Sequence, residues 1–370
     1  MDQFHDIRPY NDDEVAEVLH NLVETPDFVN TIIGFRFAQW PKFLRGPLVF
    51  GVKFALKRQI SKITNIHDFQ SIVANYMERM IKTTTSNVEY RGIEKLDKKT
   101  GYLFLSNHRD IAMDPAFVNY GLYLAGLNTV RIAIGDNLLR RPFVSDLMRL
   151  NKSFIVKRSA NGIREMMAAF GQLSGYITHS LMQDQCNIWI AQKEGRAKDG
   201  LDQTDPAIIK MFYMSQKKEK KPFAEAMANL KIVPVSISYE YDPCAFDKAN
   251  ELHQKSTTGN YEKAEFEDID SIKNGIVGQK GKVVVTFGDV IKDGFETPEE
   301  FVAEVDRQII TYYAIQSTNE AALALQKGES STDSAFSSYL ERCPENLRET
   351  VLAMYANPLK QQQKYLNKQS

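Results

Sequence analysis

The spacing of apolar and polar residues divides the chain into three regions. Residues 1–85 show helical spacing, with amphipathic stretches at 14–23 and 69–81 and no strand alternation. From residue 86 to residue 295, short β-rich apolar runs alternate with helical segments, at 102–105, 130–134, 154–156, 187–191, 232–237 and 283–287. This alternation predicts an α/β fold in which helices cover a mostly parallel, twisted sheet.

The last region, residues 296–370, has a different pattern. Helical spacing predicts a helix from Pro298 to Ile315, and a polar stretch follows at 328–332. The chain then ends in sequence rich in Lys, Gln and Asn. We expect a C-terminal helical appendage with a frayed tail.

Composition narrows the class of protein. The chain has 370 residues, with 46 Lys and Arg against 47 Asp and Glu, so its net charge of −1 attracts neither nucleic acid nor an anionic membrane as a whole. Its three scattered cysteines favour a reducing cytoplasm over a disulfide framework or a metal site. Nowhere do about 18 apolar residues occur without a charge, and the N-terminus lacks a secretion signal, so we expect neither export nor membrane spanning.

One stretch, from Phe28 to His67, has no acidic residue and alternates cations with aromatic side chains. The cations are Arg36, Lys42, Arg45, Lys53, Lys57, Arg58 and Lys62, and the aromatic residues are Phe35, Phe37, Trp40, Phe43, Phe50 and Phe54. Such a stretch suits an anionic bilayer surface, where each nearby cation contributes about 1 kcal/mol. The alternative is an ordinary pair of helices packed on the main domain.

A histidine follows the apolar run at 102–105, where a strand is expected to end and a helix to begin. Ligands bind at this edge of an α/β sheet, and a carboxylate near His108 can orient the imidazole and make it more basic. Asp110 and Asp114 are the nearby carboxylates. In the alternative interpretation His108 caps a turn and the two aspartates cap the helix.

Other enzyme classes fit these residues less well. The His-Arg-Asp triplet at 108–110 occurs in protein-kinase catalytic loops, but no glycine-rich phosphate loop precedes it and no Asp-Phe-Gly follows. A serine hydrolase would need a G-x-S-x-G nucleophile elbow, which the sequence lacks. The remaining histidines are too scattered to suggest a metal site.

A second polar turn follows the apolar run at 187–191. It contains Glu194, Gly195 and Arg196. Glycine lets the backbone turn sharply, and the planar donors of an arginine suit a phosphate. Taken alone, the segment also fits a solvated surface turn.

Together these segments resemble the glycerolipid acyltransferase superfamily, which includes glycerol-3-phosphate and lysophosphatidate acyltransferases. The resemblance covers roughly residues 90–240 and follows the order of four blocks. These are His108 with a following aspartate, residues 135–142 through 154–158, residues 194–196, and the proline-containing run at 232–237. Residues 86–295 would then be the catalytic domain.

The sequence departs from the family pattern in two places. The family usually has four residues between its catalytic histidine and aspartate, whereas Met113 stands at that position and Asp114 comes one residue later. Asp114 is favoured over Asp110 as the partner of His108, because Pro115 matches the Asp-Pro often seen in the family. The third block is also one residue shorter than the common Glu-Gly-Thr-Arg form.

The resemblance implies a mechanism and partners. His108 would act as general base on a glycerol hydroxyl, which attacks the thioester of acyl-CoA or acyl-carrier protein, with no metal and no cofactor. Substrate binding would involve residues 194–196, with Arg196 on the acceptor phosphate and Arg140, Lys157 and Arg158 as weaker candidates. The expected protein is peripheral, at the cytoplasmic face of the inner membrane, with 1-acylglycerol-3-phosphate as the favoured acceptor.

Two rival functions stay open at this stage. Glycerol-3-phosphate or another lipid head could replace the acylated acceptor. Alternatively, the chain is a catalytically silent lipid-binding homologue. The presence of His108 together with residues 194–196 weighs against a silent protein.

Overall fold

The computed structural model describes residues 2–37, 45–159, 162–264, 267–292, 294–331 and 333–367. Their contacts form two compact units, one of residues 1–76 with 131–169 and the other of residues 77–130 with 170–370. This division differs from the regions 1–85, 86–295 and 296–370 that the pattern suggested. Compact units depend on tertiary packing, which a linear pattern of apolar residues does not contain.

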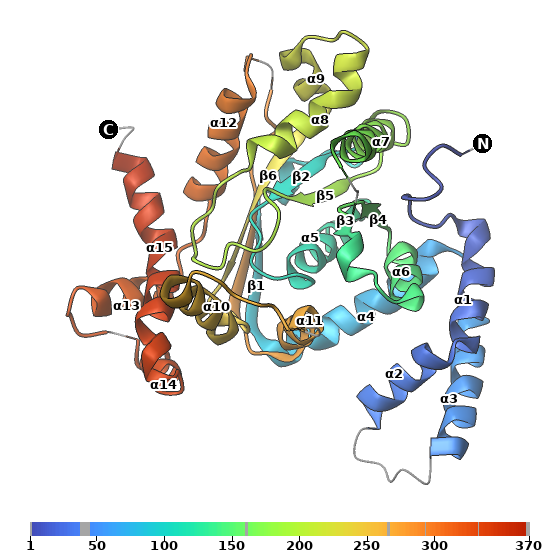
Figure 1. The fold of residues 1–370 in the computed structure, drawn as a ribbon, viewed down its shortest axis with the longest axis horizontal. Coiled ribbons are helices and arrows are strands. Elements are labelled where there is room, and N and C mark those ends of the chain that lie inside the picture. The colour runs from blue at the N-terminus through green and yellow to red at the C-terminus, as the bar shows by residue number, and fades with distance from the viewer. Residues whose placement is uncertain are drawn as a thin grey trace. The chain divides into compact units, whose positions relative to one another are not determined.

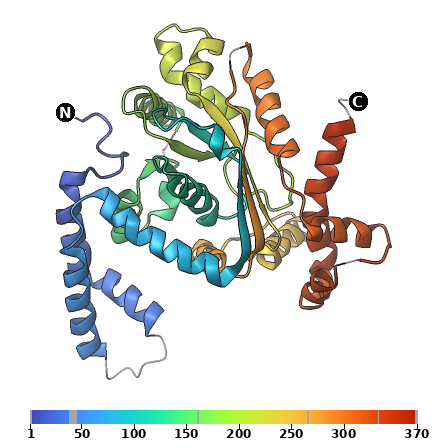
Figure 2. The same cartoon turned by 180° about the vertical axis from the view of Figure 1, so that it is seen from behind.

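The first unit combines N-terminal helices with a short parallel strand pair. Its elements are α1 (Val15–Glu24), α2 (Pro26–Arg36), α3 (Arg45–Ile60), α6 (Pro142–Leu150), β3 (Arg131–Gly135) and β4 (Ser153–Val156). Helices α1, α2 and α3 pack on one another (Figure 2). Leu19 of α1 and Leu150 of α6 belong to one apolar cluster, so the amphipathic stretch predicted at 14–23 is confirmed.

The second unit contains most of the sheet. Its described strands are β1 (Thr85–Arg91), β2 (Leu103–Ser106), β5 (Ile188–Ala191), β6 (Ile232–Tyr239) and β7 (Gly281–Phe287). They lie in the order β1-β7-β6-β2-β5 (Figure 1). All of these neighbours run parallel except β6 and β7, which are antiparallel. The α/β fold with a mostly parallel sheet is thereby confirmed.

Helices surround this sheet. The second unit includes α5 (Met113–Leu124), α8 (Pro206–Lys218), α9 (Phe223–Asn229), α10 (Ala245–Thr258), α11 (Glu267–Val277), α12 (Pro298–Thr311), α13 (Ser317–Gln326), α14 (Ser334–Glu341) and α15 (Arg348–Asn367). Two further helices, α4 (Ile66–Thr84) and α7 (Ile163–Met182), run from one unit into the other. Helix α12 packs on β6, and α15 packs on α10, α12 and α13 (Figure 1).

Each of the six predicted apolar runs contains or overlaps a strand, and β1 is the strand that the pattern missed. Its sequence, Thr-Ser-Asn-Val-Glu-Tyr-Arg, is mostly polar, and its residues are exposed or half-buried. It lies at the end of the strand order and pairs in parallel with β7. An edge strand of this kind lacks the apolar run by which the buried strands were recognised.

The prediction of a frayed tail is wrong for the residues up to Asn367, which are helical. Helix α15 continues through the Lys- and Gln-rich sequence, and its glutamines bond to other elements. The Gln362 side-chain amide donates to three backbone carbonyls at residues 310, 311 and 313. Gln361 bonds both the main-chain N–H and the main-chain carbonyl of Asp202, at 3.0 and 2.7 Å. Polar composition therefore reflects specific contacts here rather than disorder.

Helix α15 also fits closely against the loop that follows β5. Pro358 lies inside the helix and has no N–H to give to the carbonyl of Met354. Gly200 packs against this carbonyl with φ of +80°, and a Cβ added at Gly200 would lie 2.2 Å from the Met354 oxygen. Asn357 donates to the carbonyl of Asp199 at 2.8 Å. The loop and the helix therefore hold each other in place.

Replacing Gly200 with alanine is expected to destabilise the protein more than the same change at Gly259. Both glycines have positive φ, which costs an alanine roughly 1–2 kcal/mol. Nothing lies within 4 Å of a Cβ at Gly259, whereas Gly200→Ala must also displace backbone, at about 1–3 kcal/mol more. Urea denaturation midpoints of the two variants measure the difference. Equal midpoints would contradict the close packing of α15 on this loop.

Candidate active site

The site is built where two neighbouring parallel strands end. β2 and β5 pair in register from Leu103 opposite Ile188 to Ser106 opposite Ala191. Their carboxyl ends therefore lie side by side, as predicted, at the edge where α/β folds bind ligands. The Ala197 N–H donates to the carbonyl of His108 at 2.8 Å, which holds the loop after β5 against the end of β2.

His108 and Asp114 form a hydrogen-bonded pair. The imidazole Nδ1 lies 2.8 Å from Oδ2 of Asp114, and the side chains are 13 % and 0 % exposed. Because an ionised carboxylate only accepts, Nδ1 carries the hydrogen in the neutral ring. Nε2 then presents a lone pair, and in the described part of the chain it makes no hydrogen bond. Trp189 of β5 packs edge-to-face on the imidazole and limits its rotation.

The carboxylate of Asp114 is held by donors on both oxygens. Besides His108, Oδ2 accepts from the main-chain N–H of Arg109 at 2.6 Å and of Asp110 at 2.9 Å. Oδ1 accepts from the hydroxyl of Tyr239 at 2.7 Å. Four donors fix the plane of a fully buried carboxylate, which in turn fixes the imidazole.

Asp110 occupies a different position. Its Oδ1 accepts from the main-chain N–H groups of Ala112 and Met113, at 3.0 and 2.9 Å, at the start of α5. Burial, together with the nearby Asp114, raises the pKa of Asp110. On its other side α11 comes very close, since a Cβ at Gly275 would lie 2.3 Å from Oδ2. The structure thus gives Asp110 the capping contacts and Asp114 the contact with His108.

The guanidinium of Arg196 has a buried donor that makes no hydrogen bond to the described residues. Gly195 before it turns with φ of +76°, and both Glu194 and Gly195 are exposed. The half-buried guanidinium donates from Nη2 to the hydroxyl of Ser271 in α11 at 3.3 Å. Nη1 is buried and makes no hydrogen bond, and no carboxylate of the described residues pairs with Arg196. A partly buried cation without a counter-charge is costly, so this position suits an incoming anion.

The sequence analysis missed the residues that fix the two loops. Arg109 is buried and donates to Asp202 at 2.6 Å and to the carbonyls of Ala197 and Gly200 at 3.1 and 3.2 Å. Asn107 donates to Asp202 at 3.2 Å and bonds both main-chain groups of Ile237 in β6. A signal for Arg109 and Asn107 was present, because both are polar and directly follow a buried strand.

A further buried cation supports the same turn. Lys248 of α10 donates to the carbonyl of Arg109 at 2.6 Å and pairs with Asp242. Its side chain is 2 % exposed. Neither residue carried a signal in the sequence, since Lys248 lies in an ordinary amphipathic helix far from the site in the chain.

The other basic residues proposed for the acceptor belong to the first unit. Arg140 is exposed, and Lys157 pairs with Asp6 at the surface. Arg158 donates its main-chain N–H to Asp136 at 3.2 Å. That Arg140, Lys157 and Arg158 help to bind the acceptor phosphate stays a prediction.

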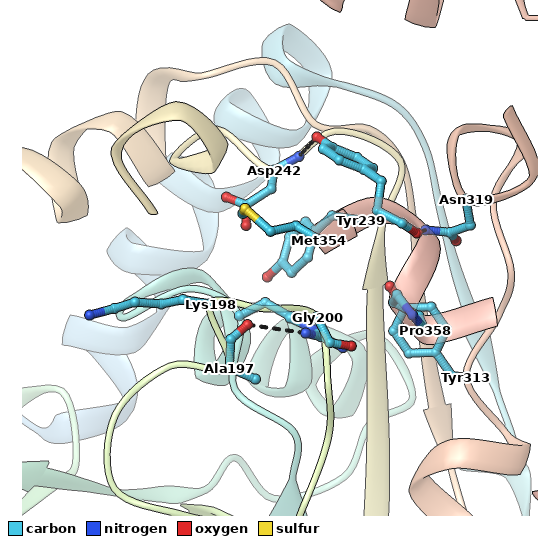
Figure 3. A pocket seen from close by; sticks show the side chains of 11 residues that line it. Ala197, Lys198, Gly200, Tyr239, Asp242, Tyr313, Asn319, Met354 and Pro358 are labelled. Atoms are coloured by element: carbon cyan, nitrogen blue, oxygen red, sulfur yellow. Dashed lines mark hydrogen bonds between the residues drawn. The ribbon is translucent and has the colours of Figure 1, made fainter. Parts of the chain in front are cut away.

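A pocket lies beside the residues that support the pair. Arg109, Tyr239, Tyr313 and Met354 are among its lining residues. Figure 3 shows Tyr239 of β6, Gly200 of the loop after β5 and Met354 of α15 around it. Its volume is about 40 Å³. That is room for a few water molecules and far too little for a fatty acyl chain.

Comparison with known proteins gives one family match. Residues 87–238 match the model of the acyltransferase family. This segment includes His108, Asp114 and Arg196. No curated protein is similar enough to be matched.

One similar solved structure is the 1-acyl-sn-glycerophosphate (LPA) acyltransferase PlsC from Thermotoga maritima. The alignment covers 80 % of this chain and 91 % of that chain, at 15 % identity and a TM-score of 0.37. A likeness this loose carries no argument about the site.

Proposed function

We propose that this chain moves a fatty acyl group from a thioester to a hydroxyl of a glycerol-phosphate lipid precursor. The match of residues 87–238 to the acyltransferase family model supports this proposal. The proposed donor is acyl-CoA or acyl-carrier protein, and the favoured acceptor is 1-acylglycerol-3-phosphate. The observation that carries the proposal is the hydrogen bond between His108 and the fully buried Asp114. Arg196, whose guanidinium lacks a counter-charge among the described residues, stands on the loop whose Ala197 is bonded to the carbonyl of His108.

The geometry supports a direct transfer with His108 as general base. Nε2 takes the hydroxyl proton while the acceptor oxygen attacks the thioester carbonyl carbon, and Asp114 stabilises the imidazolium that forms. Collapse of the tetrahedral intermediate breaks the C–S bond. The thiolate then takes the proton from the imidazolium, which restores the neutral base. The steps balance without a covalent acyl-enzyme.

Arg196 is the proposed anchor for the acceptor phosphate. It follows the turn at Gly195, and the next residue, Ala197, is bonded to the carbonyl of His108. The acceptor's phosphate and its reacting hydroxyl would therefore be held at neighbouring points. A phosphate on Nη1 would also satisfy the donor that is buried without a partner.

A membrane surface is the proposed place of work. In α3, Phe50 and Phe54 are 77 % and 65 % exposed and lie one helical turn apart, with Arg58 one turn further on. Exposed aromatic rings next to cations suit an anionic interface. Among the predicted residues of this stretch, Trp40, Lys42 and Phe43 lie outside the described residues, as do the side chains of Phe35, Arg36 and Arg45.

No helix among the described residues has both the length and the apolar character needed to cross a bilayer. The cysteines Cys186, Cys244 and Cys343 are all free. We propose a peripheral protein at the cytoplasmic face of the inner membrane, in contact with anionic lipid.

The reaction is tested by supplying the purified protein with labelled acyl-CoA or acyl-carrier protein and a panel of acceptors. The panel contains 1-acylglycerol-3-phosphate, glycerol-3-phosphate and monoacylglycerol, which lacks the phosphate. We expect acylation of the phosphorylated acceptors. Arg196→Gln should raise KM for these acceptors by roughly 10- to 100-fold, the loss of one charge-assisted phosphate contact. Transfer to no acceptor from either donor would contradict the proposed function.

The base and its partner are tested by three substitutions. His108→Ala should lower kcat by roughly 10²- to 10⁴-fold with the fold intact. Asp114→Asn should also lower kcat strongly, because the amide cannot stabilise the imidazolium. Asp110→Asn is the matched comparison and should change kcat little, because the amide oxygen can still accept from the main-chain N–H groups at the start of α5. A larger loss of kcat for Asp110→Asn than for Asp114→Asn would reverse the assignment.

The membrane contact is tested by replacing Lys53, Lys57 and Arg58 together with Gln. Binding to anionic vesicles should fall by around one to two orders of magnitude, at about 1 kcal/mol for each charge near the surface. Glu24 lies 3.0 and 2.6 Å from the amines of Lys53 and Lys57 and offsets part of their charge. Glu24→Gln is therefore expected to strengthen binding by roughly fivefold.

Vesicles of neutral lipid provide the control for this measurement, because neither variant should change binding to them. Activity on a long-chain acceptor in anionic vesicles should fall in the triple variant, while activity on a short, soluble acceptor stays constant. Equal binding of parent and triple variant to anionic vesicles would identify α3 as an ordinary packing helix.

A further inference from the structure

Tyr239 ends strand β6, one residue beyond the segment that matches the acyltransferase family. Its hydroxyl donates to Oδ1 of Asp114 at 2.7 Å, while the three other donors to this carboxylate share Oδ2. We propose that Tyr239 is a positioning residue, which acts through Asp114 to orient and tune His108. The proposal rests on the proposed function, in which His108 is the general base.

The bond from Tyr239 can affect the pair in two ways. A donor on Oδ1 fixes the rotation of the carboxylate plane, and thereby the direction in which Oδ2 faces Nδ1 of His108. The same donor draws negative charge from the carboxylate and weakens its attraction for the imidazolium. Removing the hydroxyl should therefore loosen the geometry and make His108 a stronger base.

The surroundings keep Tyr239 in place as a donor. Its ring packs edge-to-face on Phe117 of α5 with 5.9 Å between ring centroids, and the side chain is buried. Burial, together with Asp114, raises the pKa of Tyr239 well above its ordinary value, so the hydroxyl keeps its hydrogen at all working pH values. A phenylalanine fits the same space and removes the oxygen alone.

Charged groups from several neighbouring elements lie around the hydroxyl of Tyr239. Asp110 and Asp114 face it from the turn and helix after β2, and Asp242 faces it from the turn after β6. Arg109 lines the adjoining pocket, in which Figure 3 labels Tyr239 and Asp242. Lys248 of α10 binds Asp242 and the carbonyl of Arg109. Among the described residues, no other group donates to Oδ1 of Asp114. Tyr239→Phe thus leaves this oxygen without its donor.

The test is the pH dependence of acyl transfer by Tyr239→Phe. We expect kcat to fall about two- to tenfold, because a less firmly held carboxylate orients the imidazole less well, with KM for the acceptor unchanged. The acidic limb of the kcat/KM profile should move to higher pH. The sign follows because a stronger carboxylate stabilises the imidazolium, so that a higher pH is needed to free the base.

Tyr355→Phe is the matched control. Tyr355 is another buried tyrosine of the same pocket, and its hydroxyl accepts from the main-chain N–H of Asp242 and does not contact Asp114. This variant should lose stability without any shift of the acidic limb. If Tyr239→Phe behaves in the same way as Tyr355→Phe, Tyr239 is a structural residue and the proposal is overturned.

A second measurement separates this proposal from the proposed function. In protein with ¹⁵N-labelled histidine, the Nδ1-bound proton of His108 should resonate further downfield in Tyr239→Phe than in the parent, because the Asp114 carboxylate accepts more strongly. A parent protein that acylates no acceptor would end the proposed function, while this shift would still support the coupling of Tyr239 to His108. An unchanged resonance would overturn the coupling even in an active enzyme.

Discussion

The buried ion pair between Arg109 and Asp202 is the constraint on which the site depends. Both side chains are almost fully buried, and removing one partner of a buried ion pair is strongly destabilising because it leaves an uncompensated charge. Arg109 also donates to the carbonyls of Ala197 and Gly200, and Asp202 also accepts from Asn107. These bonds fix the distance between the turn after β2 and the loop after β5. His108 stands on the first of these segments, and Arg196 stands on the second.

The same arginine connects the pair of His108 and Asp114 to elements far away in the chain. Its main-chain N–H donates to Asp114 and its carbonyl accepts from Lys248 of α10. Asp202 is held through its own main chain by Gln361 of α15. The C-terminal helices therefore support the site although the family match ends at residue 238. We infer that a segment ending at residue 238 would contain His108, Asp114 and Arg196 without the support of α10 and α15.

The features of the site that arise from local sequence could be predicted, whereas those that depend on contacts between residues far apart in the chain could not. Buried parallel strands produce apolar runs, so β2 and β5, and with them the places of His108 and Arg196, were visible in the sequence. The choice of Asp114 over Asp110 rested on the family resemblance at Pro115 alone. The contacts themselves depend on a turn in which one aspartate caps α5 and the other accepts from the imidazole. In the sequence Tyr239 looks like an ordinary residue near the end of a strand. Its hydrogen bond to Asp114 could not be predicted, because the two residues are 125 positions apart.

Within the described residues, the hydrogen bonds around the site leave some polar atoms without a partner, among them the buried Nε of Arg109 and Nε1 of Trp189. Asp110 and Asp114 have partners that hold them in a single orientation, as expected for buried groups whose task is structural or electrostatic. Nε2 of His108 and Nη1 of Arg196 have no partner in the part of the chain that the structure describes. One is a lone pair that can take a proton, and the other is a cationic donor that can hold an anion. A phosphorylated alcohol satisfies both at once, whereas an unphosphorylated one leaves the guanidinium unpaired, and this difference favours the phosphorylated acceptor.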